Sequence, residues 1–306
     1  MLCGCAQLVP QTVALRTGWP EGVAQATQIA NVPFFPQDQY QCGPAALATL
    51  LAFTGVPVTP EPLVDLVYLP ARQGSLQLEM LAAPRRYDRV AYQLAPRYAD
   101  LLSEVAAGNP VLVLQDVGTM FTDWHYAVVT AFDYDAAELY LRSGTEPRVA
   151  IPFTAFERTW IKSGYWAMVV LPSDRIAATA TEERWMRAVL AMERSASAGA
   201  VTRAYATALQ RWPDNMPAAI GLANQHHAAG NLGEAAAVLR QALVRSPESV
   251  IVMNNLAQTL SDQGRQGEAL ALIERASDPK SPFASEVRAT RQLIQQRMGP
   301  PAGVKP

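Results

Sequence analysis

The chain of 306 residues has few cysteines, few histidines and almost no net charge. Two of its three cysteines, Cys3 and Cys5, lie at the extreme N-terminus, so a disulfide framework is not expected, and the C-x-x-C pairs of a structural zinc site are absent. A formal net charge of −2, without any cluster of lysine and arginine, gives no support for a nucleic-acid partner. No apolar run reaches the roughly 20 residues of a membrane-spanning helix. The length and the 50% hydrophobic content predict a globular protein of two domains, with no cofactor or metal expected.

One cysteine, Cys42, remains for the folded part of the chain. It stands in the sequence Gln-Cys-Gly-Pro-Ala-Ala, at the expected start of a helix over residues 42–53. Pro44 supports this placement, because proline fits the first helical turn, where its missing N–H is no loss. The N–H groups at a helix start stabilise negative charge and so favour a thiolate. A buried structural cysteine is the alternative interpretation.

The N-terminal residues Leu2-Cys3-Gly4-Cys5 resemble the end of a bacterial lipoprotein signal, in which the last cysteine carries the lipid. This pattern predicts lipidation of Cys5 and a location in the bacterial cell envelope, on the periplasmic side. The charged and apolar parts of such a signal are missing, so a chance match, with a cytoplasmic location, is the alternative.

Residues 32–172 predict an α+β domain with an antiparallel sheet, preceded by a polar, poorly structured lead-in within residues 1–31. Helix patterns come first and apolar strand patterns follow them. We expect helices over residues 42–53, 61–68, 75–83, 98–107 and 153–160, and strands over residues 110–115, 125–132, 139–142 and 165–171.

Residues 182–298 predict an all-α solenoid. Ala208, Ala242 and Ala276 are 34 residues apart, and Pro213 and Pro247 keep the same step. A helix-turn-helix unit of this length with small residues at close crossings is the tetratricopeptide signature, and Gly230 and Gly264 fall at the matching turns between helices. The expected repeats are residues 182–215, 216–249 and 250–283, followed by a capping helix over residues 285–298 and a disordered tail over residues 299–306. An unrelated helical bundle is the alternative.

A cysteine nucleophile requires a base and a group that stabilises the oxyanion. His125 is the candidate base, because it begins a predicted strand and the other histidines, His226 and His227, lie in the repeat region. Those two are adjacent on one helix and point in different directions, so they are not expected to bind a metal. Gln37 is the candidate oxyanion donor, with Gln39 and Gln41 as competing candidates. A structural histidine and a solvated loop glutamine are the alternatives.

Together, Gln37, the Cys42-Gly-Pro-Ala-Ala segment and the His125-Tyr-Ala-Val-Val segment resemble the papain-like bacteriocin-processing peptidases. These are the double-glycine leader peptidase domains of peptide exporters and their stand-alone relatives. The resemblance covers residues 32–171. It implies a papain-like α+β fold, with Cys42 as the nucleophile, His125 as the general base and Gln37 in the oxyanion hole. Since no membrane-spanning segment or nucleotide-binding glycine loop accompanies it, the stand-alone type fits better.

The chain departs from that family at one position. The family orients its histidine with an aspartate on the following strand, where this sequence has Ser143. A serine hydroxyl accepts a hydrogen bond from the imidazole but cannot stabilise an imidazolium as a carboxylate does. Asp123, Asp133 and Asp135 are nearby carboxylates, so the third member stays open.

Three functions are compatible with these residues. The first is a cysteine peptidase whose repeat region binds a protein substrate or partner. The second is a papain-like protein of little or no activity that acts as a binding scaffold, which the missing aspartate favours. The third is an amidase or transferase on peptide amides, which would use the same acyl-enzyme. The retained Gln37, Cys42 and His125 favour a peptidase.

Overall fold

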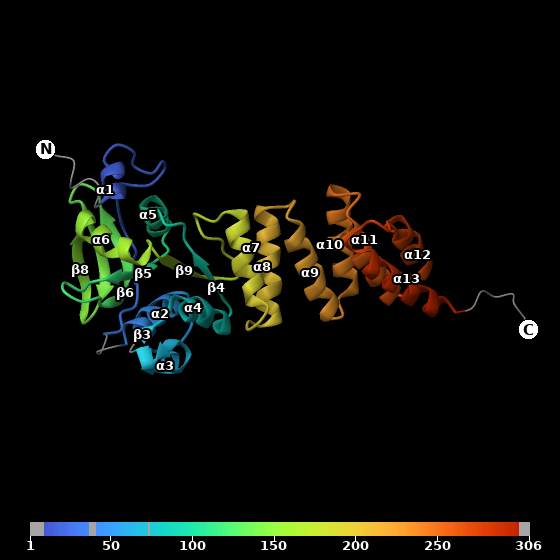
Figure 1. Ribbon diagram of the computed structural model, residues 1–306, viewed down its shortest axis with the longest axis horizontal. Helices are drawn as coiled ribbons and strands as arrows, with labels where there is room; N and C mark the ends of the chain where they lie inside the picture. The colour runs from blue at the N-terminus through green and yellow to red at the C-terminus, as the bar shows by residue number, and fades with distance from the viewer. Residues whose placement is uncertain (1–8, 37–40, 73, 300–306) are drawn as a thin grey trace, which may run out of the picture. The chain divides into compact units, whose positions relative to one another are not determined.

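The computed structural model describes residues 9–36, 41–72 and 74–299, so Cys5 and Gln37 lie outside the described residues. The chain forms two compact units, residues 1–200 and residues 201–306. Figure 1 shows strands and helices mixed in the first unit and helices in the second.

The first unit contains a seven-stranded sheet whose pairings are all antiparallel. Six strands follow the order β4-β9-β5-β6-β7-β8, and β1 pairs with β6. The strands are β1 (Ala26–Gln28), β4 (Arg89–Gln93), β5 (Val111–Asp116), β6 (Trp124–Asp133), β7 (Glu138–Ser143), β8 (Glu146–Pro152) and β9 (Ala167–Pro172). A small hairpin is formed by β2 (Tyr68–Leu69) and β3 (Gly74–Ser75). The expectation of an α+β domain with an antiparallel sheet is confirmed.

Helices cover both faces of this sheet (Figure 1). On one side lie α2 (Cys42–Phe53), α3 (Glu61–Val67) and α4 (Gln77–Ala82), and on the other lie α1 (Pro10–Leu15), α5 (Tyr98–Ala106) and α6 (Phe153–Trp160). The helix α2 is apolar on all sides, since every residue from Gly43 to Leu51 is buried, as expected for a helix enclosed in a core. Its leucines pack on alternate residues of the central strands, including Leu112, Val128 and Met168. This packing fixes the start of α2, and therefore Cys42, against the sheet.

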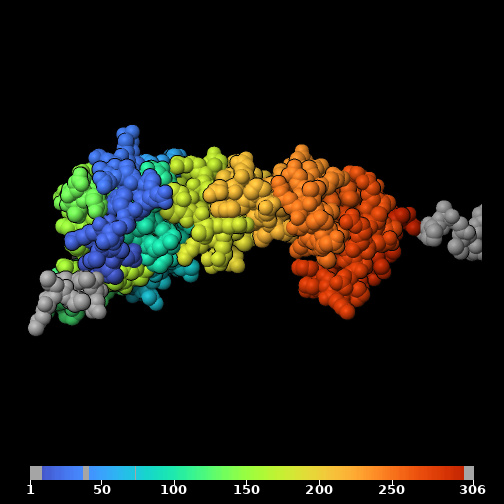
Figure 2. Space-filling model, turned by 90° about the horizontal axis from the view of Figure 1, so that it is seen from above, coloured from blue at the N-terminus to red at the C-terminus, as the bar shows by residue number. Residues whose placement is uncertain are grey.

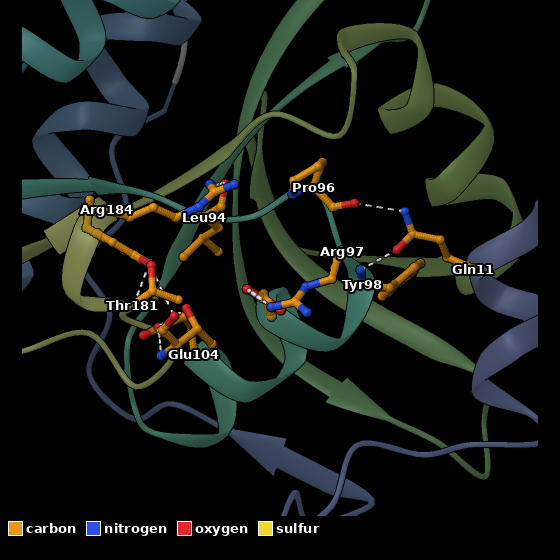
Figure 3. A network of polar contacts seen from close by, with 11 residues as sticks. Gln11, Leu94, Pro96, Arg97, Tyr98, Glu104, Thr181 and Arg184 are labelled. Atoms are coloured by element: carbon orange, nitrogen blue, oxygen red, sulfur yellow. Dashed lines mark hydrogen bonds and ion pairs between the residues drawn. The ribbon is translucent and has the colours of Figure 1, made fainter. Parts of the chain in front are cut away.

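The expected poorly structured lead-in is wrong over the residues that the structure describes. The helix α1 begins at Pro10, and the fully buried carboxylate of Glu157 accepts hydrogen bonds from the N–H groups of Gln11 (2.9 Å) and Thr12 (2.6 Å). The Gln11 side chain in turn accepts from the N–H of Tyr98, the first residue of α5 (Figure 3). The composition of this segment does not predict these contacts, because the residues that form hydrogen bonds with its polar groups lie far away in the chain. Figure 2 shows the segment, in blue, spread over the surface of the first unit.

The segment after β9 is also held to the first unit by a buried carboxylate. Glu104 of α5 is fully buried and accepts from both the N–H and the hydroxyl of Thr179, each at 2.7 Å. The next helix, α7 (Glu182–Met192), packs against β4, and its Arg184 donates to the carbonyl of Leu94 (Figure 3). The first predicted repeat, residues 182–215, therefore extends from the first unit into the second.

The second unit consists of helices that follow a period of 34 residues. The helices are α8 (Ala198–Arg211), α9 (Met216–Ala228), α10 (Leu232–Arg245), α11 (Val250–Asp262), α12 (Gln266–Arg275) and α13 (Ala284–Met298). From α9 to α11 the starting residue moves from 216 to 250, and from α10 to α12 it moves from 232 to 266, which is 34 in both cases. Gly230 and Gly264 end α9 and α11 with φ values of 76° and 79°, a conformation that favours glycine. Gly221 lies so close to the Tyr205 ring that a methyl group there would be 2.4 Å from Cζ. The helical repeat fold is confirmed.

No helix among the described residues is long and apolar enough to cross a lipid bilayer.

Candidate functional site

The first residue of α2, Cys42, is half-buried and is the free cysteine of the described chain. Burial raises the pKa of its thiol above the ordinary value of 9.0. The backbone N–H groups of Tyr126, Gly43 and Cys42 itself act in the opposite direction, because they stabilise a thiolate. The contact with Tyr126 places the Cys42 sulfur beside the residue that follows His125. The sequence prediction of a thiol at a helix start is therefore correct in position, but burial outweighs the helix in setting the pKa.

The candidate base, His125, is the second residue of β6 and pairs with Gln115 of β5. Burial lowers the pKa of its imidazole below the ordinary value of 6.5, and the carboxylate of Asp123 partly offsets this effect. Both Cys42 and His125 thus favour their neutral forms. These two directions both oppose a preformed thiolate and imidazolium.

Ser143, the last residue of β7, lies in contact with this imidazole: its Oγ is 2.8 Å from Nε2 of His125. β7 pairs with β6, which brings the two residues together although 18 positions separate them. A local irregularity between β7 and β8 occurs between Leu141 and Ser143. The structure thus places a hydroxyl where the sequence analysis expected the orienting group.

The other carboxylates considered from the sequence occupy different places. Asp133 ends β6, and its carboxylate accepts from the N–H of Ala136 in the turn to β7. Asp135 lies in that same turn. Asp123 lies two residues before His125, and its charge raises the pKa of both Cys42 and His125. Of these three, Asp123 is the carboxylate that acts on the candidate pair.

The surroundings of Cys42 include a residue that sequence reasoning missed. Ser75 of β3 lies so close to Gly43 that a methyl group on Gly43 would be 2.3 Å from the Ser75 hydroxyl oxygen. The backbone carbonyl of Ser75 accepts from the hydroxyl of Tyr126 at 3.2 Å. The hairpin β2–β3 is therefore held next to the nucleophile, and any side chain after Cys42 would force Ser75 to move. No local signal marks Ser75, since its role depends on a contact across 32 residues.

The second unit has a polar hollow of about 80 Å³ between repeat helices. Three carboxamide side chains line it: Asn224 from α9 and Asn255 and Gln258 from α11. His227, also at this hollow, contacts Asp262 at 2.7 Å. No group of three histidine, cysteine or acidic residues able to hold a metal occurs in the part of the chain that the structure describes.

Comparisons with known proteins extend these observations. Residues 29–168 match the model of the Peptidase_C39 like family, and residues 226–294 match a tetratricopeptide repeat model. A search of the curated proteins returned no match.

Solved structures similar to part of this chain include three peptidase chains. One is a putative C39-like peptidase from Bacillus anthracis, with 17% identity and a TM-score of 0.42, covering 50% of this chain and 100% of that one. Another is a double glycine motif protease from an AMS/PCAT transporter in complex with the leader peptide, with 22% identity, a TM-score of 0.37 and coverage of 48% and 97%. The third is the peptidase domain of Streptococcus ComA, a bi-functional ABC transporter involved in quorum sensing, with 20% identity, a TM-score of 0.39 and coverage of 46% and 99%.

The resemblance noted from Cys42 and His125 is confirmed at the level of the family model. The protein carries a C39 peptidase-like α+β domain followed by a helical region with tetratricopeptide repeats.

Proposed function

We propose that this protein is a cysteine peptidase. His125 takes the proton of the Cys42 thiol as the sulfur attacks a peptide carbonyl carbon, and the C–N bond then breaks as His125 returns that proton to the leaving amine. Water hydrolyses the resulting thioester and restores the thiol. The observation that carries the proposal is that Cys42 packs against the buried cluster that contains Tyr126, the residue after His125, and that His125 is itself hydrogen-bonded to Ser143.

The contact between Nε2 of His125 and the Ser143 hydroxyl leaves Nδ1 as the proposed base. When Nε2 carries the proton it donates to the Ser143 hydroxyl, and Nδ1 keeps the lone pair that accepts the thiol proton. A hydroxyl holds the ring in this orientation without adding negative charge. The imidazolium that forms during attack is therefore stabilised less than it would be beside a carboxylate.

The pKa shifts of Cys42 and His125 support a mechanism in which His125, as a general base, removes the thiol proton while the sulfur attacks the substrate. The raised pKa of Cys42 and the lowered pKa of His125, both due first to burial, keep the proton on sulfur until substrate is bound. The backbone N–H groups of Cys42 and Gly43 at the start of α2 then stabilise the developing charge. Gln37 is proposed to complete the oxyanion hole, although it lies outside the described residues.

We propose that the repeat region binds an extended segment of a protein partner or substrate. The carboxamides of Asn224, Asn255 and Gln258 each carry a donor and an acceptor, which matches the pattern of a peptide backbone. This arrangement suits a peptide without requiring a charged ligand.

A lipid on Cys5, with a location in the bacterial cell envelope, also stays a proposal. Expression with an upstream secretion signal, followed by partition into detergent, tests it, with Cys5→Ser as the control. Wild-type protein that stays in the aqueous phase would contradict lipidation.

A binding scaffold of little activity is the second candidate, favoured by Ser143 in place of a carboxylate. An alkyne-tagged peptidyl acyloxymethyl ketone and a tryptic peptide mixture distinguish the two. If the protein is a peptidase, the ketone labels Cys42 and the peptides are cleaved. The Cys42→Ala variant loses both the labelling and the cleavage. The His125→Ala variant cleaves the peptides about 10²–10⁴-fold more slowly. Labelling of Cys42→Ala at the wild-type level, or no cleavage by wild-type protein, would refute the peptidase.

A further inference from the structure

The loop between β5 and β6 exposes large apolar side chains next to the candidate site. We use "apolar loop" for residues 117–124, which include Val117, Met120, Phe121 and Trp124. The exposed fractions of Met120 and Phe121 are 86% and 84%. Single exposed apolar residues are common on protein surfaces, but four large ones within eight residues indicate an interaction site.

The apolar loop is held in one shape by hydrogen bonds at its base. The carboxylate of Asp116 accepts from the N–H of Gly118 at 3.0 Å and from the N–H of Asp123 at 2.9 Å, and it pairs with Lys162 at 3.1 Å. The N–H of Val117 donates to the carbonyl of Asp123 at 2.9 Å. The two ends of the loop are thereby closed on each other.

The tip of the loop turns tightly above this base. A methyl group on Gly118 would be 1.7 Å from the carbonyl oxygen of Phe121, so the turn admits only glycine. Because the loop is ordered before any ligand arrives, binding through Met120 and Phe121 loses little conformational entropy in the backbone.

The apolar loop borders the candidate catalytic pair. Trp124 ends the loop and directly precedes His125 on β6. The carboxylate of Asp123 is close enough to act on both the Cys42 thiol and the His125 imidazole. A peptide whose scissile bond reaches Cys42 therefore passes close to the loop.

We propose that the apolar loop binds large apolar side chains of the substrate next to the scissile bond, with Met120 and Phe121 as specificity-determining residues. This inference rests on the proposed peptidase function and adds a substrate class to it. The cleaved peptides carry leucine, isoleucine, methionine or aromatic residues close to the cleaved bond.

Charge distinguishes a peptide from a membrane as the occupant. A loop that inserts into an anionic bilayer is typically accompanied by lysine or arginine. Residues 117–124 contain no basic residue, Asp123 adds a negative charge, and Lys162 is paired with Asp116. This balance favours an uncharged apolar segment of polypeptide.

The first experiment compares full-length wild-type protein with the double variant Met120→Ser/Phe121→Ser on a tryptic peptide mixture, with cleavage sites read by mass spectrometry. We expect wild-type cleavage sites to be enriched in large apolar neighbours, and the double variant to cleave those peptides roughly tenfold more slowly. Val13→Ser on α1, whose side chain is 40% exposed, is the matched control and keeps the wild-type preference. An unchanged preference in the double variant would overturn the proposal.

A second experiment tests the proposed role of the apolar loop independently of the proposed peptidase activity. Cys42→Ala, with and without the two serine substitutions, is applied to an array of immobilised peptides with apolar or polar centres. Apolar selectivity that disappears with Met120 and Phe121 supports the loop even if wild-type protein cleaves nothing. Equal binding of both peptide classes overturns it. Flotation with vesicles of phosphatidylcholine and phosphatidylglycerol tests the membrane, and loop-dependent flotation without peptide selectivity also overturns the proposal.

Discussion

Substitution of Ser143 by aspartate places a carboxylate where the hydroxyl now contacts His125. The Ser143 Oγ atom is 2.8 Å from Nε2, and both residues are half-buried, so a charge introduced there is only partly screened by water. The imidazole currently has a lowered pKa because burial disfavours its charged form. A carboxylate beside it opposes that effect directly.

The magnitude of this effect follows from the distance. A charge of opposite sign within about 4–6 Å shifts a pKa by roughly 1–3 units towards the charged form, or about 1.4–4 kcal/mol. We therefore expect Ser143→Asp to raise the pKa of His125 by that amount. The acid limb of the pH profile of kcat/KM moves to higher pH by the same number of pH units. On acidification, His125 in the variant is protonated, and stops acting as a base, at a higher pH than in wild-type protein. Ser143→Ala removes only a neutral hydrogen bond, about 0.5–1.5 kcal/mol, and lowers the pKa slightly.

The assay is an NMR titration of the imidazole Cε1–H resonances. The chain has three histidines, so the His125 signal is identified by its absence in His125→Ala. Ser143→Asn is the matched control, because it has the shape of aspartate without the charge. A pKa of His125 that is the same in Ser143→Asp as in wild-type protein would refute the orientation inferred from the structure. An equal shift in Ser143→Asn would show that charge is not the cause.

Three further predictions follow from single contacts. Alkylation of Cys42 by iodoacetamide should rise with pH through a midpoint above 9.0, because burial raises the thiol pKa; a midpoint below 8 contradicts this. Glu157→Gln replaces one carboxylate oxygen by an amide N–H₂, which cannot accept from whichever N–H it faces, that of Gln11 or that of Thr12. It should lower the free energy of unfolding by roughly 2–3 kcal/mol in urea denaturation, whereas a loss below the error of the measurement contradicts it. Gly221→Ala should cost about 1–3 kcal/mol, measured as a lower Tm of the second unit, because the new methyl group overlaps the buried Tyr205 ring; an unchanged Tm contradicts it.

Much of the fold could be predicted from short-range patterns. The apolar run after Cys42 specifies α2 from residue 42 to residue 53, and the 34-residue spacing of alanines specifies the helical repeats. The edge strand β8 was missed because proline occurs near both its ends and its residues are mostly exposed, which gives no strand periodicity. β1 was missed because three residues are too few to show alternation.

In the candidate site, as in the fold, local sequence patterns predict some features and miss others. The positions of Cys42 and His125 were predictable from residue type and spacing, whereas the sign of their pKa shifts was not, because burial depends on the whole domain. The place of Ser143 on the strand after His125 predicts its contact with the imidazole, whereas no neighbouring residue predicts the contact of Ser75 with Gly43.

The sequence by itself determined the elements whose signals are local: a helix that begins at Cys42, a strand that begins near His125, and a repeat of fixed period. The tertiary structure alone decided that Ser75 lies against Gly43, that Glu157 receives the start of α1, and that Met120 and Phe121 stay exposed on a closed loop. The physical reason is that helix and strand formation depend on neighbouring residues. Desolvation and hydrogen-bond partners depend instead on which distant segments pack together.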